Sequence, residues 1–149
     1  PYILAQSAVA VSGAADTAEN TLATLTVEGR ALGPNGTLCI LSRWTYTNSS
    51  NNKTLRVRFS GASGTIFTSK IVNTSVATLT ISLISNVNAN NSQRGSELSG
   101  AVGATSGSAT ATAAVDTTVD TTLVITGQKV TGTETLTLDG YTVLLLYGA

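Results

Sequence analysis

Asp116 and Asp120 stand four positions apart and form a pair of carboxylates that could do chemistry. Two carboxylates on one face can cleave a glycosidic bond or hold a hard cation, and positions four apart share a face in an extended segment. The surrounding sequence, TAAVDTTVDTTLV, is rich in threonine and lacks the repeated Asp/Asn pattern of a cation-binding loop. A plain polar edge is therefore the favoured interpretation, and a glycan-cleaving site is the weaker one.

The chain contains few other groups that could catalyse a reaction. It has no His and only eight acidic residues, which removes the commonest general base and the commonest metal ligand. The single Cys39 excludes an intrachain disulfide and a zinc site of several thiolates, and its place in an apolar strand pattern predicts a small buried hydrophobe. No phosphate-binding, dinucleotide-binding or serine-elbow motif is present. We expect neither enzymatic activity nor a bound cofactor or metal.

Three arginines, Arg43, Arg56 and Arg58, occupy alternate positions of two strand-like runs, Thr37 to Tyr46 and Leu55 to Phe59. An Asn/Ser-rich tip between the runs predicts a hairpin, and a hairpin would place the three side chains on one sheet face. Such a face could bind phosphate or a carboxylated sugar, or pair with acidic residues of a neighbouring subunit. A solvated or intersubunit face is favoured, so these arginines are the candidate subunit contacts.

Aromatic and amide side chains gather at the tip of the same predicted hairpin: Trp44, Tyr46, Asn48, Asn51 and Asn52. If exposed, this cluster would form a platform for stacking and hydrogen bonding to a sugar. A large aromatic residue with apolar neighbours at a period of two is more often part of a core. Core packing of Trp44 is therefore favoured, and a glycan-contact tip is the alternative.

The elements that must position these residues are strands. Apolar residues alternate with threonine over most of the chain, which suits a pleated, half-buried surface and disfavours a helix. Eight or nine short strands with Gly/Asn/Ser turns predict an all-β sandwich or barrel. The expected strands are 2–11, 21–27, 37–46, 55–59, 65–72, 76–87, 119–126, 133–138 and 141–147.

Three segments depart from this pattern. Asp16 to Leu25 begins with a plausible helix N-cap, and a short helix there is the less favoured alternative to a strand. Asn88 to Ser99 is polar and predicts a loop. Gly100 to Ala114 is a low-complexity run of small residues, for which a surface loop is favoured over a tightly packed strand.

Length and composition bound the class of protein. The 149 residues predict one domain, 1–149, with an N-terminal arm at 1–13. Charged residues make up 11% and the net charge is zero, so we expect no attraction to nucleic acid or to an anionic membrane, and a tendency to self-associate. The longest apolar run, Val143 to Tyr147, is too short to span a bilayer. Pro1 is either the native first residue after removal of Met or the boundary of a fragment, and the sequence leaves both open.

Three stretches resemble small virion proteins of tailed bacteriophages and prophages. One is LGPNGTLCILSRWTYTNSSNNKTLRVRFSG, Leu32 to Gly61; the others are VDTTLVITGQKVTGTETLTLDGYTVLLLYG, Val119 to Gly148, and the opening ILAQSAVAVSGAADTAENTLATLTV. The resemblance implies a single-domain, jelly-roll-like antiparallel β-sandwich of about eight to nine strands, assembled as a trimer. Such proteins serve as capsid decoration (cement) proteins, as head- or tail-fibre domains, or as receptor-binding tips. The family offers no catalytic residues to transfer.

These features lead to one expected function and one alternative. The expected function is that of a trimeric capsid decoration protein, which is made in the host cytoplasm, is carried on the virion surface, and contacts the major capsid protein or other virion proteins. The alternative is a receptor-binding or fibre-tip module that recognises host surface glycan. Head or tail location, oligomer number, host and receptor are left open.

Overall fold

Alternating apolar residues build strands over nearly all of the described chain. The computed structural model describes residues 1–97 and 111–149, and this part contains eleven strands and no helix. The strands are β1 Tyr2–Ser7, β2 Val11–Ser12, β3 Asn20–Val27, β4 Thr37–Tyr46, β5 Lys53–Phe59, β6 Thr65–Val72, β7 Ala77–Asn86, β8 Gln93–Glu97, β9 Ala111–Ala113, β10 Thr121–Lys129 and β11 Leu136–Leu146.

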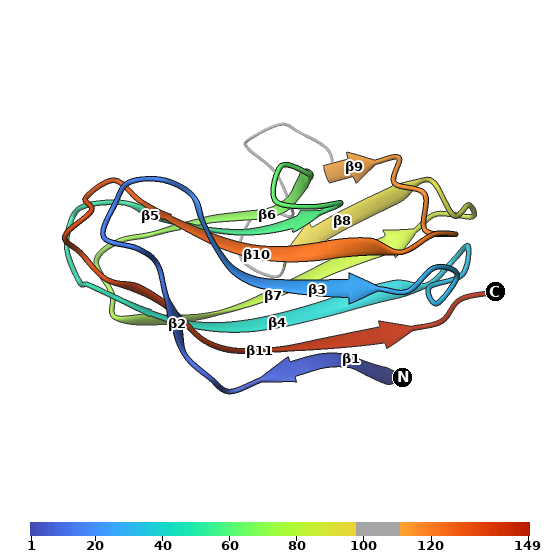
Figure 1. The fold of residues 1–149 in the computed structure, drawn as a ribbon, viewed down its shortest axis with the longest axis horizontal. Helices are drawn as coiled ribbons and strands as arrows, with labels where there is room; N and C mark the ends of the chain where they lie inside the picture. The colour runs from blue at the N-terminus through green and yellow to red at the C-terminus, as the bar shows by residue number, and fades with distance from the viewer. Residues whose placement is uncertain (98–110) are drawn as a thin grey trace.

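The strands form two antiparallel sheets that face each other (Figure 1). The larger sheet has the order β1-β11-β4-β7-β8-β9, with β2 also paired to β11, and the smaller has the order β3-β10-β5-β6. Eight strands pair as one long hairpin folded on itself: β1 with β11, β3 with β10, β4 with β7, and β5 with β6. This nesting is the wiring of a jelly roll. The predicted all-β, jelly-roll-like sandwich is confirmed, with the short strands β2, β8 and β9 added to those eight.

The predicted hairpin from Thr37 to Phe59 is wrong. β4 pairs with β11 and β7 in the larger sheet, whereas β5 pairs with β10 and β6 in the smaller sheet. Residues 47–52 therefore cross from one sheet to the other as an arch. β4 and β5 each turn their apolar face into the shared core, from opposite sides. Both strands therefore alternate inward and outward residues although they do not pair with each other.

Several boundaries also differ from expectation. The alternative of a short helix within Asp16 to Leu25 is not realised, because β3 begins at Asn20. The predicted loop Asn88 to Ser99 contains β8, and the runs 133–138 and 141–147 belong to one strand, β11, with a bulge between Leu138 and Gly140. Residues 98–110, which include the end of that predicted loop and most of the low-complexity run Gly100 to Ala114, lie outside the described residues, and Ala111–Ala113 forms β9.

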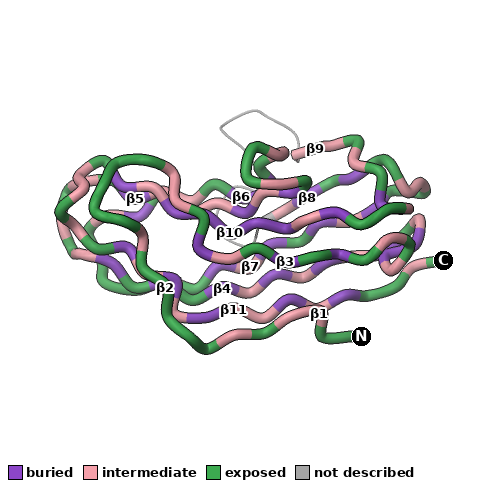
Figure 2. The backbone as a smooth tube through the Cα atoms, in the orientation of Figure 1, coloured by how far each residue is buried: buried purple, intermediate pink, exposed green. Residues whose placement is uncertain are grey.

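The core fills the space between the sheets, and buried positions alternate along strands such as β4, β5 and β7 (Figure 2). Phe59 of the smaller sheet and Phe67 beside it meet edge to face, with ring centroids 6.3 Å apart. Burying such rings supplies a large share of the hydrophobic free energy. Other fully buried side chains include Leu38, Ile40, Trp44, Leu55, Ile84, Leu123 and Ile125.

Residues 2–7 and 11–12, within the predicted N-terminal arm, pair with β11 at the edge of the larger sheet. Their side chains are mostly exposed. Because the part of the chain that the structure describes has no helix, it has none long and apolar enough to cross a membrane.

Candidate functional site

The three candidate arginines do not share a face. Arg43 lies in β4 on the outer face of the larger sheet, whereas Arg56 and Arg58 lie in β5 on the outer face of the smaller sheet. The shared face predicted from the hairpin is therefore wrong, because β4 and β5 belong to different sheets. A role for these residues in subunit contact stays a prediction.

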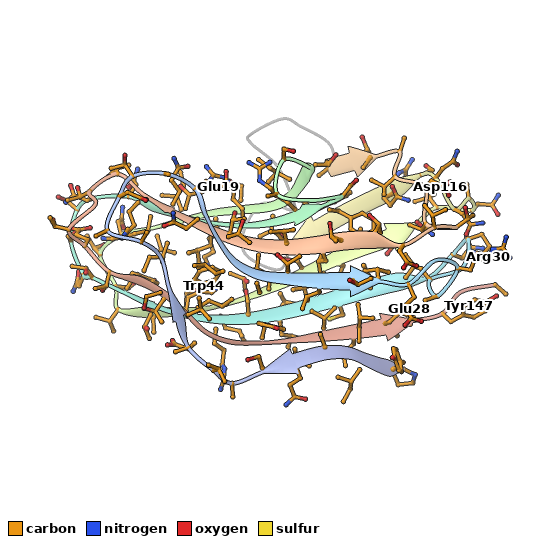
Figure 3. The ribbon with its side chains drawn as sticks, in the orientation of Figure 1. Glu19, Glu28, Arg30, Trp44, Asp116 and Tyr147 are labelled. Atoms are coloured by element: carbon orange, nitrogen blue, oxygen red, sulfur yellow. The ribbon has the colours of Figure 1, made fainter. Side chains whose placement is uncertain are left out.

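Arg56 and Arg58 are held by one carboxylate within the chain. Arg58 Nε and Nη2 donate to the two carboxylate oxygens of Glu19 at 2.7 and 2.8 Å, and Arg56 Nη1 lies 3.4 Å from Glu19 Oε2. The Thr126 hydroxyl also donates to Glu19. The hydrogen bonds from Arg58, together with these neighbours, lower the pKa of Glu19 to about 2. This ion pair fastens the segment before β3 to the outer face of the smaller sheet (Figure 3).

Trp44 and Tyr46 point inward, so neither forms an exposed stacking platform. Trp44 is 1% exposed and lies between the sheets (Figure 3), and its Nε1 donates to Ser42 Oγ at 2.8 Å. Tyr46 is also buried, and its hydroxyl lies 2.6 Å from Ser75 Oγ. The favoured prediction of a core Trp44 is confirmed, and neither aromatic ring is exposed at the predicted glycan-contact tip.

The asparagines of the predicted tip belong to the arch between the sheets. Asn48 and Asn52 are exposed, whereas Asn51 is half-buried and donates from Nδ2 to Glu134 Oε1 at 2.9 Å. The ammonium group of Lys53 fills the inside of this arch.

Lys53 is fully buried and contacts its carboxylate partner Glu134 Oε2 at 2.8 Å. It also donates to the carbonyls of Thr47 and Asn51 at 2.7 and 2.9 Å. Lys53 lowers the pKa of Glu134 to about 2, with further hydrogen bonds from Ser49 and Asn51. The tip is thus organised around an internal ammonium group.

Asp116 and Asp120 are each engaged in local hydrogen bonds. Their segment is a turn, and each carboxylate accepts local hydrogen bonds: Asp116 from the Thr118 hydroxyl and amide, and Asp120 from the Gly29 amide at 2.9 Å. The hydrogen bonds from Thr118 lower the pKa of Asp116. Asp116 lies at the end of the sandwich where the C-terminus lies (Figure 3). Among residues 1–97 and 111–149, no cluster of three or more His, Cys, Asp or Glu side chains could hold a metal.

The outer face of the larger sheet is unexpectedly apolar. Ile3, Leu144, Cys39 and Leu83 are successive neighbours across β1, β11, β4 and β7. We call these four residues the apolar row. The next position along the strands adds Leu41 and Ile81, which also pair with each other. Ile3 is 56% exposed and Leu83 is 39% exposed.

Cys39 lies within this row instead of in the core. The prediction that Cys39 is a small buried hydrophobe is wrong. Cys39 occupies an outward position of β4, and its neighbours in the apolar row leave it half-buried. This partial burial raises the pKa of the thiol.

Beside the apolar row, the same face is hollowed on both sides of Arg43. The first hollow, of about 290 Å³, is bordered by β1, β4, β7 and β11; the second, of about 480 Å³, lies between the ends of β4 and β7 and the bulge of β11. We call the two hollows together the Arg43 groove. Its outward polar side chains are Gln6, Arg43, Thr45, Asp139 and Thr142, and Leu41 and Leu79 form its apolar part.

A glycine makes room for the arginine in this groove. Arg43 is the cross-strand partner of Gly140, and a β-carbon on residue 140 would lie 2.8 Å from Arg43 Nη2. The bulge in β11 adds Asp139, whose carboxylate accepts a hydrogen bond from Thr45 Oγ1 at 3.1 Å. The Asp-Gly pair between two apolar runs is a signal of such an irregularity. No local sequence pattern marks Gln6 and Thr142, because only the pairing of distant strands brings them beside Arg43.

Comparisons with known proteins give no family. No family model matches the chain, and no curated protein matches it. The similar solved structures include the CBM2 module of the evolved Dit of Lactobacillus casei BL23 phage J-1, with a TM-score of 0.43 and 9% identity, covering 85% of this chain and 69% of that one.

Two lectin structures are also similar. Lectin I from Ulex europaeus, in complex with the methyl glycoside of α-L-fucose, has a TM-score of 0.43 and 7% identity and covers 92% of this chain and 85% of its own. The Lotus tetragonolobus seed lectin has a TM-score of 0.38 and 8% identity, covering 85% of this chain and 80% of that one.

Proposed function

We propose that this chain is a non-enzymatic structural protein of a bacteriophage virion, which binds neighbouring protein subunits through the outer face of its larger sheet. The apolar row is the observation that carries the proposal, because it extends across four strands without a charged side chain. Contiguous exposed apolar patches mark interaction surfaces. The sequence resemblance to small phage virion proteins supports the assignment to a bacteriophage virion.

In its finer form, the proposal is a homotrimeric capsid decoration protein on the virion surface, seated on the major capsid protein. The zero net charge supports assembly, because copies of the chain do not repel one another. A stable interface buries about 800 Å² on each partner, and the outer face of a sheet is an extended surface from which that area can be drawn. Many copies, each weakly bound, would together resist the pressure of the packaged genome.

Two measurements test assembly and location. Light scattering coupled to size-exclusion chromatography is expected to give about three times the 15.1 kDa chain mass. Cryo-electron microscopy of the particle is expected to show hundreds of copies on the head. A monomer in solution together with a few copies at the tail end would overturn the decoration role.

A matched pair of variants tests the surface. Leu83→Glu places a charge in the apolar row, whereas Ile71→Glu places one on the outer face of the smaller sheet, where Ile71 is 60% exposed. We expect Leu83→Glu to weaken association at least tenfold and Ile71→Glu to leave it unchanged. Equal behaviour of the two variants would count against the larger sheet as the docking face.

Glycan recognition is the second candidate function, and the Arg43 groove is the observation that favours it. The groove offers charged, amide and hydroxyl groups beside apolar carbon, the combination typical of small-ligand sites. The buried Trp44 and Tyr46 remove the tip from consideration as a stacking platform. Binding of the purified chain to host envelope glycans tests this function, and failure to bind any envelope fraction would end it.

A further inference from the structure

The first hollow of the Arg43 groove is lined by polar side chains that have no partner. Gln6, Arg43 and Thr142 make no side-chain hydrogen bond or ion pair to another residue that the structure describes. On the opposite sheet, Arg56 and Arg58 are both tied to Glu19. The hollow therefore gathers donors and acceptors that are not used to hold the fold together.

We propose that the first hollow of the Arg43 groove binds the carboxylate of an acidic sugar residue in a surface glycan. The inference rests on glycan recognition, the second candidate function, and names the ligand class and the residue that selects it. Arg43 forms a two-pronged charged hydrogen bond with the carboxylate, a geometry that the planar guanidinium favours.

The rest of the hollow suits the sugar ring. The Gln6 amide and the Thr142 hydroxyl, which lie at outward positions beside Arg43, provide hydrogen-bond donors and acceptors for sugar hydroxyl groups. Leu41 and Leu79 supply an apolar surface for the C–H face of the ring. A volume of about 290 Å³ is near the lower end of the range for small-ligand pockets, which favours a single monosaccharide unit.

The second hollow sets the order of sugars along the groove. Asp139 and Thr45 border it, and the Asp139 carboxylate already accepts a hydrogen bond from Thr45. A second carboxylate placed there would be repelled by Asp139. The unit next to the acidic sugar is therefore neutral, with hydroxyl groups that donate to Asp139.

The test uses the full chain on an array of defined oligosaccharides. The array holds glycans that contain a uronic or sialic acid, the same glycans with the carboxyl group methyl-esterified, and neutral glycans. We expect binding to at least one acidic glycan, with methyl esterification weakening that binding by about 10- to 100-fold.

Two substitutions of equal charge change separate the groove from the general surface. Arg43→Gln is expected to weaken binding to the acidic glycan as much as esterification does. Arg94→Gln, on an exposed position of β8 in the same sheet and outside the groove, is expected to leave it unchanged. Thermal unfolding of both variants checks that neither has lost its fold.

The outcomes separate the inference from the function on which it rests. Binding of neutral glycans with unchanged affinity in Arg43→Gln would overturn the acidic-sugar inference and keep glycan recognition. Binding of acidic glycans that Arg43→Gln does not alter would also overturn the inference. If no glycan on the array is bound, both are wrong, and a protein side-chain carboxylate becomes the ligand to test for Arg43.

Discussion

At the scale of single residues, Trp44 combines hydrophobic burial with one hydrogen bond. Its indole is 1% exposed, and its Nε1 donates to Ser42 Oγ, which also lies in hydrogen-bond contact with the Thr80 hydroxyl. This buried chain of hydrogen bonds fixes the orientation of the indole ring, because the indole N–H meets a hydrogen-bond acceptor in only one orientation.

Trp44→Phe is expected to lower the free energy of unfolding by about 2–3 kcal/mol, because it leaves a void and removes the donor to Ser42. Guanidinium chloride unfolding measures the change. Val76→Ala serves as the control, since Val76 is 62% exposed and its truncation is expected to cost less than about 0.5 kcal/mol. A similar small change in both variants would contradict the core position of Trp44.

Glu19 makes stability depend on pH below the usual carboxylate range. Its pKa is lowered from 4.5 to about 2 in the folded chain, so its contribution is complete above about pH 4.5 and is lost as the pH falls towards 2. After discounting for screening at this partly exposed site, Glu19→Gln is expected to cost about 1–2 kcal/mol at pH 7.

Urea unfolding of the wild type and of Glu19→Gln between pH 7 and pH 2 measures this effect. The difference in stability between the two proteins is expected to shrink steadily below about pH 4.5. The exposed Glu28 offers a control, and Glu28→Gln is expected to follow the wild type. A difference that stays constant to pH 2 would show that Arg58 does not hold Glu19.

At the scale of elements, β8 shows a strand whose inward residues are not hydrophobic. Gln93 donates from Nε2 to Asn86 Oδ1 and to the Val115 carbonyl, and Gly95 lies against the ring of Phe67. A β-carbon at position 95 would collide with that ring. Gly95 thus permits β8 to lie over an aromatic side chain of the other sheet.

Gly95→Ala is expected to destabilise the fold by about 1–3 kcal/mol, because either Phe67 or β8 must shift to relieve the collision. Ser96→Ala tests the neighbouring outward position and is expected to change stability by less than about 0.5 kcal/mol. Thermal unfolding compares the two variants. If Gly95→Ala unfolds with the wild type, β8 does not pack on Phe67 as described.

The sequence predicted where strands lie better than it predicted their partners. The runs 37–46 and 65–72 coincide with β4 and β6, because alternation records which side chains face a core. Alternation does not record whether the next strand lies beside the first or across the core from it, so the pattern predicts a hairpin where the chain forms an arch. Lys53 at an inward position of β5 was the available signal, since its ammonium group needs the carbonyls of a surrounding loop.

The candidate site was only partly predictable for the same reason. Arg43 was identified from the sequence, but its grouping with Arg56 and Arg58 depended on a wrong pairing. Gln6 and Thr142 reach the Arg43 groove because β1 pairs with β11, a contact between residues more than 130 positions apart. No local pattern contains such a contact.

At the scale of the whole molecule, the charge is zero and stays so over a broad pH range. The eight basic residues balance the eight acidic residues, and there is no His to titrate between pH 5 and 8. Long-range repulsion between copies is therefore absent throughout that range.

Self-association is expected to vary less than about threefold between pH 6 and 7.5, and to weaken below about pH 4, where carboxylates are protonated and the chain becomes positive. Sedimentation velocity at fixed salt measures this dependence. Added salt is expected to restore association at low pH, since it screens the repulsion. A sharp change between pH 6 and 7.5 would point to a titrating group that the composition does not contain.

The nested pairing of strands has a consequence for how the chain is made. β11 lies between β1 and β4 and leaves the ribosome after the other ten described strands, so the larger sheet lacks an inner strand until residue 146 has emerged. Until then β1 and β4 expose unpaired edges and apolar side chains. Contacts between distant residues fold slowly, and incomplete chains with open edges aggregate. During translation, therefore, chaperone binding to the nascent chain should persist until β11 is added.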